Sequence, residues 1–307
     1  MQNTNNVSWR HPIAEQTPVE GDQRAEVTPF VFNNRLYRLE NFVRSVDFPG
    51  EKPDYRFFED GFRIRDVEKN RIVSVPLLNH YFAVAFPWEN YVYVYAGDYE
   101  ENRPWWHIRN TVMLRSDDLI TWSKPEVVLQ AEGNERIFNY AVCRARGKFY
   151  MLYETNDSRW PPPFTLRFCE SDDLINWRKL SEEHIYGLGK YTGGPALYYD
   201  EAEDYFYCLY VAHIPGGYEN RITRSQDLIN WEDAHHPVVT FDPNRFVDPI
   251  RWPGAKECSS SDIEMCEYNG KTYIYWLNGN QQGACRLYQS VYDGGLFELL
   301  RRFFETD

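Results

Sequence analysis

Several carboxylates and one histidine stand at the ends of apolar segments, where their side chains could do acid–base chemistry. Asp262 follows three serines and opens the apolar segment DIEMCEY, and Glu264 shares its face by the two-residue period of a strand. Glu154 ends the run FYMLY, Glu40 ends a similar run in RLENF, and His80 begins another. Two such groups can protonate a leaving oxygen and activate water, or attack as a nucleophile. Each also has a structural interpretation, as a solvated strand end, a loop charge or a hydrogen-bonded histidine.

Aromatic and polar side chains between the apolar segments could bind a ligand. The loops PWWH at 104–107 and RWPPP at 159–163 are rich in aromatic residues and proline. Exposed-loop aromatics of this kind are uncommon without a binding task. Aromatic rings could stack on sugar faces, and arginine or amide groups could hydrogen-bond hydroxyl or carboxylate groups. The candidate binding residues are Arg56, Trp105, Trp106, His107, Arg109, Asn139, Tyr140, Trp160, Arg221, Gln281 and Gln282, with Trp276 as a further aromatic.

An internal repeat organises the elements that must position these residues. The heptapeptides SDDLITW at 116–122, SDDLINW at 171–177 and SQDLINW at 225–231 recur about 55 residues apart. Serine and aspartate side chains set turns by bonding nearby backbone groups, and leucine and tryptophan would pack an outer strand. We therefore interpret the motif as architecture and not as chemistry.

Five pairs of short apolar segments, joined by turns such as Asn269-Gly270, indicate β-hairpins. They begin near residues 28, 80, 139, 194 and 262, a spacing that fits a four-stranded antiparallel sheet per repeat. The pattern predicts an all-β, five-bladed β-propeller over 27–307, with 1–26 as an N-terminal extension closing on it. The first blade is divergent, with a long insertion at Asp47–Asp66, and Leu296–Phe304 could be a closing strand or a helix.

The innermost strands of a propeller line a central funnel, so the side chains at their starts would converge at its mouth. Two carboxylates facing each other there would suit glycoside hydrolysis. The positions concerned are Glu26, Thr28, Asn79, His80, Asn139, Tyr140, Thr192, Gly193, Asp262 and Glu264.

Composition excludes several classes of function. The 307 residues carry a net charge of −13, which argues against a nucleic-acid or anionic-membrane partner, and 17 % of them are aromatic, which favours strands. No apolar run spans a membrane and no apolar signal segment opens the chain, so we expect a cytoplasmic protein, or a secreted or periplasmic one whose signal peptide has been removed. The six cysteines form no CxxC pair and fit buried thiols. No ligand spacing supports a metal or other cofactor, a divalent ion on the propeller axis included, so none is predicted.

The sequence resembles the five-bladed propeller glycosidases, nearest to glycoside hydrolase families 43 and 117 and their unclassified relatives. The resemblance covers roughly residues 27–305. It rests on the S-x-D-L-x-x-W repeats, on Gly194–Tyr199, and above all on Ser261–Tyr273 with Gly279–Gly283. It implies a bacterial, exo-acting and inverting glycosidase, with Asp262 matching a functional aspartate of a similar S-D-x-D/E strand.

The chain departs from the family at the usual general base. Family 43 enzymes open their first blade with Asp-Pro, whereas this chain has Thr28-Pro29. The candidates to replace that base are Glu26, Glu40 and the segment Asp54-Tyr55-Arg56. Family 117 enzymes resemble this chain in using a histidine as a candidate acid, which keeps His80 and His107 in consideration.

The leading hypothesis is therefore an exo-glycoside hydrolase that removes a terminal sugar, such as an anhydro-, furanosyl or L-configured one, from an oligosaccharide. Asp262 and Glu154 are the first candidates for its carboxylates. Three alternatives remain open at this point. They are a non-catalytic carbohydrate-binding propeller, a propeller scaffold for protein partners, and a glycoside phosphorylase whose phosphate would bind Arg56, Arg109 and Arg221. The sugar, the stereochemistry and the oligomeric state are not specified by the sequence.

Overall fold

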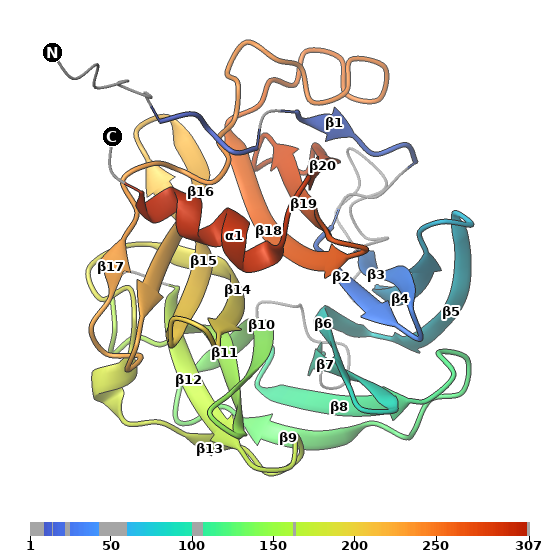
Figure 1. The fold of residues 1–307 in the computed structure, drawn as a ribbon, viewed down its shortest axis with the longest axis vertical. Coiled ribbons are helices and arrows are strands. Elements are labelled where there is room, and N and C mark those ends of the chain that lie inside the picture. Colours follow the sequence, from blue (N-terminus) through green and yellow to red (C-terminus); the bar gives the residue numbers. More distant parts are fainter. Residues whose placement is uncertain are drawn as a thin grey trace, which may run out of the picture.

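The computed structural model describes residues 9–13, 15–21, 25–42, 60–99, 107–161 and 164–305. These residues form five blades of four strands each and little helix, as the sequence predicts (Figure 1). Blade 1 comprises β2 (Val27–Phe32), β3 (Arg35–Phe42), β4 (Gly61–Asp66) and β5 (Arg71–Leu78). Blade 2 comprises β6 (His80–Trp88), β7 (Tyr91–Asp98), β8 (Asn110–Ser116) and β9 (Glu126–Gln130).

Blades 3 to 5 follow the same antiparallel order, from an innermost strand outward. Blade 3 comprises β10 (Arg136–Ala145), β11 (Lys148–Asn156), β12 (Thr165–Ser171) and β13 (Arg178–Lys179). Blade 4 comprises β14 (Thr192–Asp200), β15 (Tyr205–Ile214), β16 (Gly217–Ser225) and β17 (Glu232–Asp233). Blade 5 comprises β18 (Ser259–Tyr268), β19 (Lys271–Gly279), β20 (Cys285–Tyr292) and β1 (Thr17–Pro18).

The blades are arranged in a ring. The innermost strands contact one another in the order β2, β6, β10, β14, β18 and back to β2. One parallel bridge, Tyr218 to Ser259, also links blades 4 and 5. The prediction of a five-bladed propeller is therefore confirmed, and the starts of the five inner strands meet around one axis.

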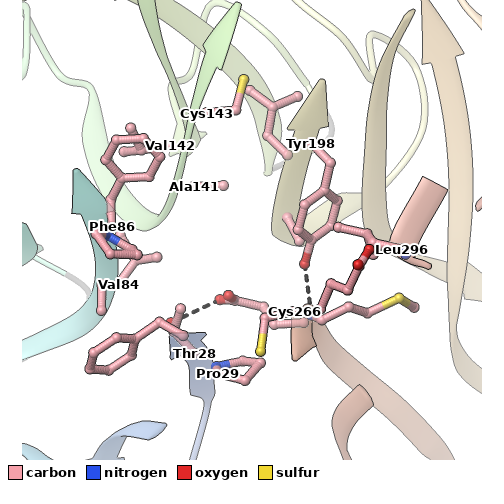
Figure 2. A pocket seen from close by; sticks show the side chains of 18 of the residues that line it. Thr28, Pro29, Val84, Phe86, Ala141, Val142, Cys143, Tyr198, Cys266 and Leu296 are labelled. Atoms are coloured by element: carbon pink, nitrogen blue, oxygen red, sulfur yellow. Dashed lines mark hydrogen bonds between the residues drawn. The ribbon is translucent and has the colours of Figure 1, made fainter. Parts of the chain in front are cut away.

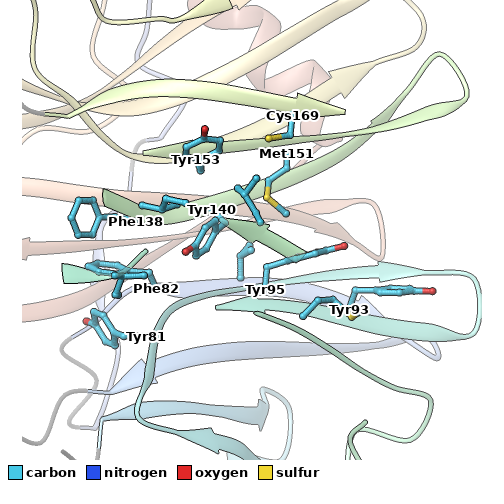
Figure 3. Close-up of a cluster of buried hydrophobic side chains, with 14 of the residues drawn as sticks. Tyr81, Phe82, Tyr93, Tyr95, Phe138, Tyr140, Met151, Tyr153 and Cys169 are labelled. Atoms are coloured by element: carbon cyan, nitrogen blue, oxygen red, sulfur yellow. The ribbon is translucent and has the colours of Figure 1, made fainter. Parts of the chain in front are cut away.

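The cores lie between neighbouring blades, because each sheet buries both of its faces. Figure 3 shows the cluster between blades 2 and 3, where Tyr95, Tyr140 and Tyr153 are almost fully buried. Similar clusters join blades 1 and 2, blades 3 and 4, and blades 4 and 5. The aromatic richness of the sequence is thus used mostly to fill these wedge-shaped gaps.

The repeated heptapeptide forms a turn, as its structural interpretation predicts. In the first copy, Ser116 Oγ accepts the Leu119 N–H at 2.8 Å, and Asp118 Oδ1 accepts the N–H groups of Ile120 and Thr121, both at 2.7 Å. Leu119, Leu174 and Leu228, the same position in all three copies, have positive φ angles of 64°, 67° and 61°. These local bonds hold each leucine in the left-handed region that it otherwise avoids.

Residues from both ends of the described chain complete blade 5. Thr17 and Pro18 of β1 pair with Gln289 and Tyr288 of β20. Nearby, the Trp9 Nε1–H donates to the Arg302 carbonyl at 3.0 Å. The outermost strand of the last blade therefore comes from the start of the sequence.

The structure decides between the two alternatives for Leu296–Phe304 and changes one expectation about blade 1. Leu296–Phe304 forms α1 (Leu296–Arg301) and the 3-10 turn η3 (Arg302–Phe304), which pack beside β18 and β19, and not a closing strand (Figure 1). The supposed insertion Asp47–Asp66 ends in β4, an integral strand of blade 1, because Gly61–Asp66 pairs with β3 on one side and β5 on the other. Positions 47–59 lie outside the described residues.

Candidate active site

Irregularities in the inner strands shape the mouth of the funnel. In β6, β10, β14 and β18 the register with the next strand shifts near the strand start. The residues at these bulges have positive φ angles: Phe82 at 57°, Asn139 at 29°, Gly194 at 50° and Asp262 at 53°. A bulge re-aims the side chain it carries. Four blades therefore carry a bulge with a positive φ angle near the start of the inner strand. In blades 3 and 5 the residues at these bulges are Asn139 and Asp262.

Glu154 comes from β11 and points at the bulge of blade 4. Its Oε2 accepts the Gly194 N–H at 2.8 Å and the Asn139 Nδ2–H at 3.1 Å. The side chain is only 6 % exposed. Burial and, to a lesser degree, the charge of Asp262 raise the pKa of Glu154 to about 7, although both hydrogen bonds act to lower it.

Asp262 approaches the same place from blade 5. A Cβ atom at Gly194 would press on the Asp262 carboxylate, and one at Gly193 would lie 3.1 Å from Glu154 Oε2. The glycine pair therefore lets two carboxylates approach one stretch of backbone. Burial raises the pKa of Asp262 to about 6, and a hydrogen bond from the Ser261 side chain lowers it.

Glu26 is the third carboxylate, and it lies directly before β2. The Tyr81 hydroxyl donates to Glu26 Oε2 at 2.7 Å. Burial, the charge of Asp262 and then that of Glu154 raise the pKa of Glu26 to about 8. From the sequence, Glu26 is one of the residues expected at the mouth and a candidate replacement base, but it is not among the first candidates for the catalytic carboxylates. Its position at the start of an inner strand was the available signal, because the mouth collects those positions.

These three groups form one electrostatic unit, which we call the carboxylate cluster (Glu26, Glu154 and Asp262). Their mutual repulsion and burial disfavour full ionisation, so the cluster retains a proton near neutral pH. Asp262 has the lowest of the three raised pKa values and Glu26 the highest. The arrangement holds an ionised and a protonated carboxyl side by side, which acid–base catalysis requires.

Glu264 lies further along β18 and does not join the mouth in the same way. The two-residue period of a strand predicts that Asp262 and Glu264 share one face. The bulge between Ser261 and Glu264 interrupts this period, so the period alone does not determine where the two side chains lie. The Thr28 hydroxyl donates to Glu264 Oε1 at 3.1 Å. Burial raises the pKa of Glu264 well above its usual range. The threonine of the unusual Thr28-Pro29 pair thus bonds a carboxyl group from the neighbouring blade.

A cavity of about 420 Å³ lies beyond Glu264, among the later residues of the inner strands. Its lining is largely apolar and includes Phe86, Val142 and Tyr198, together with Leu296 of α1 (Figure 2). Glu26, Glu154 and Asp262 are not among its lining residues. The funnel therefore has a charged end at the strand starts and an apolar end beyond them.

Glu40 serves a different network. Its carboxylate accepts hydrogen bonds from Arg38 at 2.8 Å, Arg63 at 2.7 Å and Arg65 at 2.8 Å, and it is fully buried. The three guanidinium groups outweigh the effect of burial and lower the pKa of Glu40. A carboxylate so committed is suited to holding β3 and β4 together in blade 1, and the structure does not bring it into the carboxylate cluster.

The two candidate histidines make no hydrogen bond to the carboxylate cluster in any contact of the described residues. His80 Nδ1 lies 2.8 Å from the Leu78 carbonyl, and its Nε2 lies 3.7 Å from Asp98 Oδ1. His107 is half-buried, just before Ile108.

The predicted binding residues divide into several groups. Asn139 contacts Glu154, as described above. Arg109 donates to the carbonyls of Gly133 and Ala131 at 2.7 and 3.3 Å, and Arg221 donates to Glu219 Oε1 at 2.6 Å. Two aromatics belong to cores: Tyr140 to the cluster between blades 2 and 3, and Trp276 to the one between blades 4 and 5. Trp160 is half-buried under the Arg159 guanidinium, and Gln281 and Gln282 are exposed. Asp54, Tyr55, Arg56, Trp105 and Trp106 lie outside the described residues.

Within the described ranges, no group of three or more histidine, cysteine, aspartate and glutamate side chains is arranged to hold a metal ion. The same residues contain no helix whose length and apolarity would suit a bilayer crossing.

Comparison with solved structures shows that this fold is similar to those of several glycoside hydrolases. An α-L-arabinofuranosidase from Lactobacillus brevis superposes with a TM-score of 0.59 at 13 % identity, covering 89 % of this chain and 93 % of that one. The α-L-arabinofuranosidase PaAbf62A from Podospora anserina, in complex with cellotriose, gives 0.60 at 10 % identity over 91 % and 94 %. A thermostable family-43 glycoside hydrolase gives 0.59 at 9 % identity over 92 % of each chain. No family model and no curated protein matches the sequence. At these identities the resemblance is confirmed for the fold.

Proposed function

We propose that the protein is an exo-acting, inverting glycoside hydrolase whose carboxylate cluster performs the acid–base chemistry. The observation that carries the proposal is the convergence of Glu26, Glu154 and Asp262 at one funnel mouth with pKa values of about 8, 7 and 6. Structural ion pairs usually lower carboxylate pKa values, as the arginines do for Glu40. A cluster in which all three carboxyl groups have a raised pKa is unusual in a merely structural role. Groups with strongly shifted pKa values gather at functional sites.

In this mechanism Glu154 is the general acid and Asp262 the general base. The two donors to Glu154 bond only its Oε2, so a proton on Oε1 can point toward a glycosidic oxygen. Asp262 has the lowest pKa of the cluster and is the ionised member that activates water. Glu26, protonated and bonded to Tyr81, limits the negative charge that the other two experience.

The substrate we propose is an oligosaccharide with a terminal furanosyl or L-configured sugar. Two fold neighbours are named as α-L-arabinofuranosidases. An α-L-arabinofuranosyl group is both furanosyl and L-configured, so it is the first sugar to test. The acidic chain, with a net charge of −13, favours a neutral sugar over an anionic one.

The test is hydrolysis of a panel of 4-nitrophenyl glycosides and of arabinoxylan oligosaccharides by the wild type and by Glu154→Gln and Asp262→Asn. Loss of an acid or base typically lowers the rate by about 10²- to 10⁴-fold. Glu203→Gln is a matched control, because Glu203 lies in the turn at the far end of β14 and pairs with Arg301. Proton NMR of the first product shows inversion directly.

Full activity in either site variant on a confirmed substrate would reject the assignment. A second outcome would support a carbohydrate-binding propeller: calorimetry would detect oligosaccharide binding to the wild type, with no turnover.

A further inference from the structure

A continuous series of aromatic rings runs beside the carboxylate cluster. Each ring contacts the next, and the series passes from blade 2 through blade 3 to blade 4. We call it the aromatic arc, and its members in order are Tyr81, Phe82, Phe138, Phe164, Tyr191, Tyr218 and His213.

The first part of the arc is buried. Tyr81 and Phe82 pack edge to face with ring centroids 4.6 Å apart, Phe82 and Phe138 lie 5.6 Å apart, and Phe138 and Phe164 lie 5.8 Å apart. Tyr81, Phe82 and Phe138 are 5 %, 6 % and 4 % exposed, and Figure 3 shows them together at one end of the core between blades 2 and 3. Their faces are therefore occupied by protein and offer nothing to a ligand.

The second part of the arc is less buried than the first and ends at the exposed ring of His213. Phe164 and Tyr191 lie 5.3 Å apart, Tyr191 and Tyr218 also 5.3 Å, and Tyr218 and His213 5.1 Å. Phe164, Tyr191 and Tyr218 are half-buried and His213 is exposed. Tyr218 and His213 face each other across the β15–β16 hairpin. The arc is thus buried in blade 2 and reaches solvent at His213 in blade 4.

Both parts of the arc are tied to the cluster. Tyr81 bonds Glu26, which fixes the buried part beside one carboxylate. Tyr191 lies beside the acid: a Cβ atom at Gly193 would be 3.5 Å from Tyr191 Cε1 and 3.1 Å from Glu154 Oε2. Burial raises the pKa of Tyr191, and the charges of Glu154 and Asp262 add to the rise. A ligand that passes Glu154 on the blade 4 side therefore meets Tyr191 first and Tyr218 next.

We infer that Tyr191, Tyr218 and His213 form the subsite for the leaving part of the substrate, and that Tyr218 stacks on the sugar next to the cleaved bond. This inference rests on the proposed function. The general acid must stand beside the glycosidic oxygen, so the leaving sugar lies on the open side of Glu154. The terminal sugar lies over the carboxylate cluster itself. Because the buried rings of the arc close the blade 2 side, no further sugar can extend in that direction, and the enzyme acts only on chain ends or branches.

The chemical class recognised at this subsite is a neutral pyranose with an apolar face, such as a xylosyl unit. Aromatic rings bind such faces by contact and dispersion. The order of events needs no new residue: Glu154 gives its proton to the leaving oxygen, and the released sugar departs across Tyr218 toward solvent.

The test compares two substrates that carry the same terminal sugar. One is xylotriose with a single α-L-arabinofuranosyl branch, and the other is α-L-arabinofuranosyl fluoride, whose leaving group is too small to reach Tyr218. Tyr218→Ala should lower kcat/KM about fivefold to tenfold on the branched xylotriose and less than twofold on the fluoride. Tyr218→Phe should have the kcat/KM of the wild type on both substrates, since the hydroxyl is not required for stacking.

Two further variants keep the result interpretable. Tyr218→Leu retains apolar volume if the alanine variant folds poorly, and it should show the same difference between substrates because it has no flat face. Tyr268 lies at the far end of β18 from Asp262, so Tyr268→Leu should leave kcat/KM unchanged on both substrates. Equal losses on both substrates, or no loss on the branched one, would overturn the inference.

Failure of the proposed function is a separate result. If the wild type hydrolyses neither compound, calorimetry with the branched xylotriose decides the inference instead. Weaker binding by Tyr218→Ala than by Tyr218→Phe would support it, and equal or absent binding for both would overturn it.

Discussion

Replacing Glu154 with glutamine should stabilise the protein at alkaline pH. A glutamine has nearly the same shape, and its Oε1 can accept the hydrogen bonds from Gly194 and Asn139. It differs in having no charge to bury. The substitution therefore isolates the cost of holding an ionised carboxylate at this place.

The size of the effect follows from the pKa of Glu154. The folded state raises it from 4.5 to about 7, so the native protein holds this proton more tightly than the unfolded chain does. A raised carboxylate pKa costs nothing below the unfolded value, and the cost grows as pH rises toward the folded value. At about 1.36 kcal/mol per pKa unit, the complete cost above pH 8 is about 3 kcal/mol. Glu154→Gln should recover most of that at pH 8.5 and little of it at pH 5.

The assay is urea denaturation at pH 5 and pH 8.5, with the free energy of unfolding taken by linear extrapolation. Glu40→Gln is the matched control, because its carboxylate is also buried but its arginine neighbours lower its pKa. That stabilisation is present above the unfolded pKa of a glutamate and is lost only as pH falls through the lower folded value. Glu40→Gln should therefore destabilise the protein at both pH values, the opposite sign to Glu154→Gln at pH 8.5.

The reasoning would be refuted if Glu154→Gln changed the unfolding free energy equally at pH 5 and pH 8.5. That result would mean that Glu154 titrates alike in the folded and unfolded states. Its proposed role as a protonated acid near neutral pH would then lose its physical basis.

The remaining predictions concern activity. The kcat/KM of the wild type should peak between about pH 6 and about pH 7, because Asp262 gains a proton below that range and Glu154 loses one above it; a flat profile would contradict these assignments. Asn139→Ala removes a donor to the Glu154 carboxylate, so the alkaline limb should move up by roughly half to one pH unit, and a downward shift in the measured profile would exclude this role. Gly194→Ala should lower the unfolding free energy by about 1–3 kcal/mol and remove most activity, because the φ angle there is 50° and the new methyl group would press on Asp262 and Val211. A stable, active variant in the same assays would count against the role of this glycine.

Much of the architecture could be predicted from the sequence, because the repeat is explicit. The serine, aspartate and leucine of each heptapeptide specify a local turn, and the offsets between copies specify the blade. The origin of the last strand could not be read in the same way. Thr17 and Pro18 carry no strand pattern of their own, and their pairing with Gln289 and Tyr288 is set by a neighbour far away in the chain.

The candidate site was predictable only in part. Asp262 and Glu154 stand out as charges beside apolar runs, and both converge on the mouth. Glu40 has the same local pattern, yet its partners Arg63 and Arg65 come from a strand that the sequence reading assigned to an insertion. Glu26 also stands beside an apolar run, directly before β2, but its interaction with Asp262 and Glu154 depends on strands far away in the sequence. A local pattern identifies a buried carboxylate but not the charges that will surround it.

The joint between β1 and β20 has a consequence for how the protein is made. Blade 5 is complete only when the strand supplied by residues 17–18 meets the strand at 285–292, and the second of these is synthesised long after the first. Blades 2 to 4 are each complete within a short stretch of chain and can form during synthesis, whereas the early strand must wait without its partner. The funnel mouth needs Asp262 of the last blade as well as Glu26 of the first. The carboxylate cluster therefore cannot assemble until β18 of blade 5 has been synthesised.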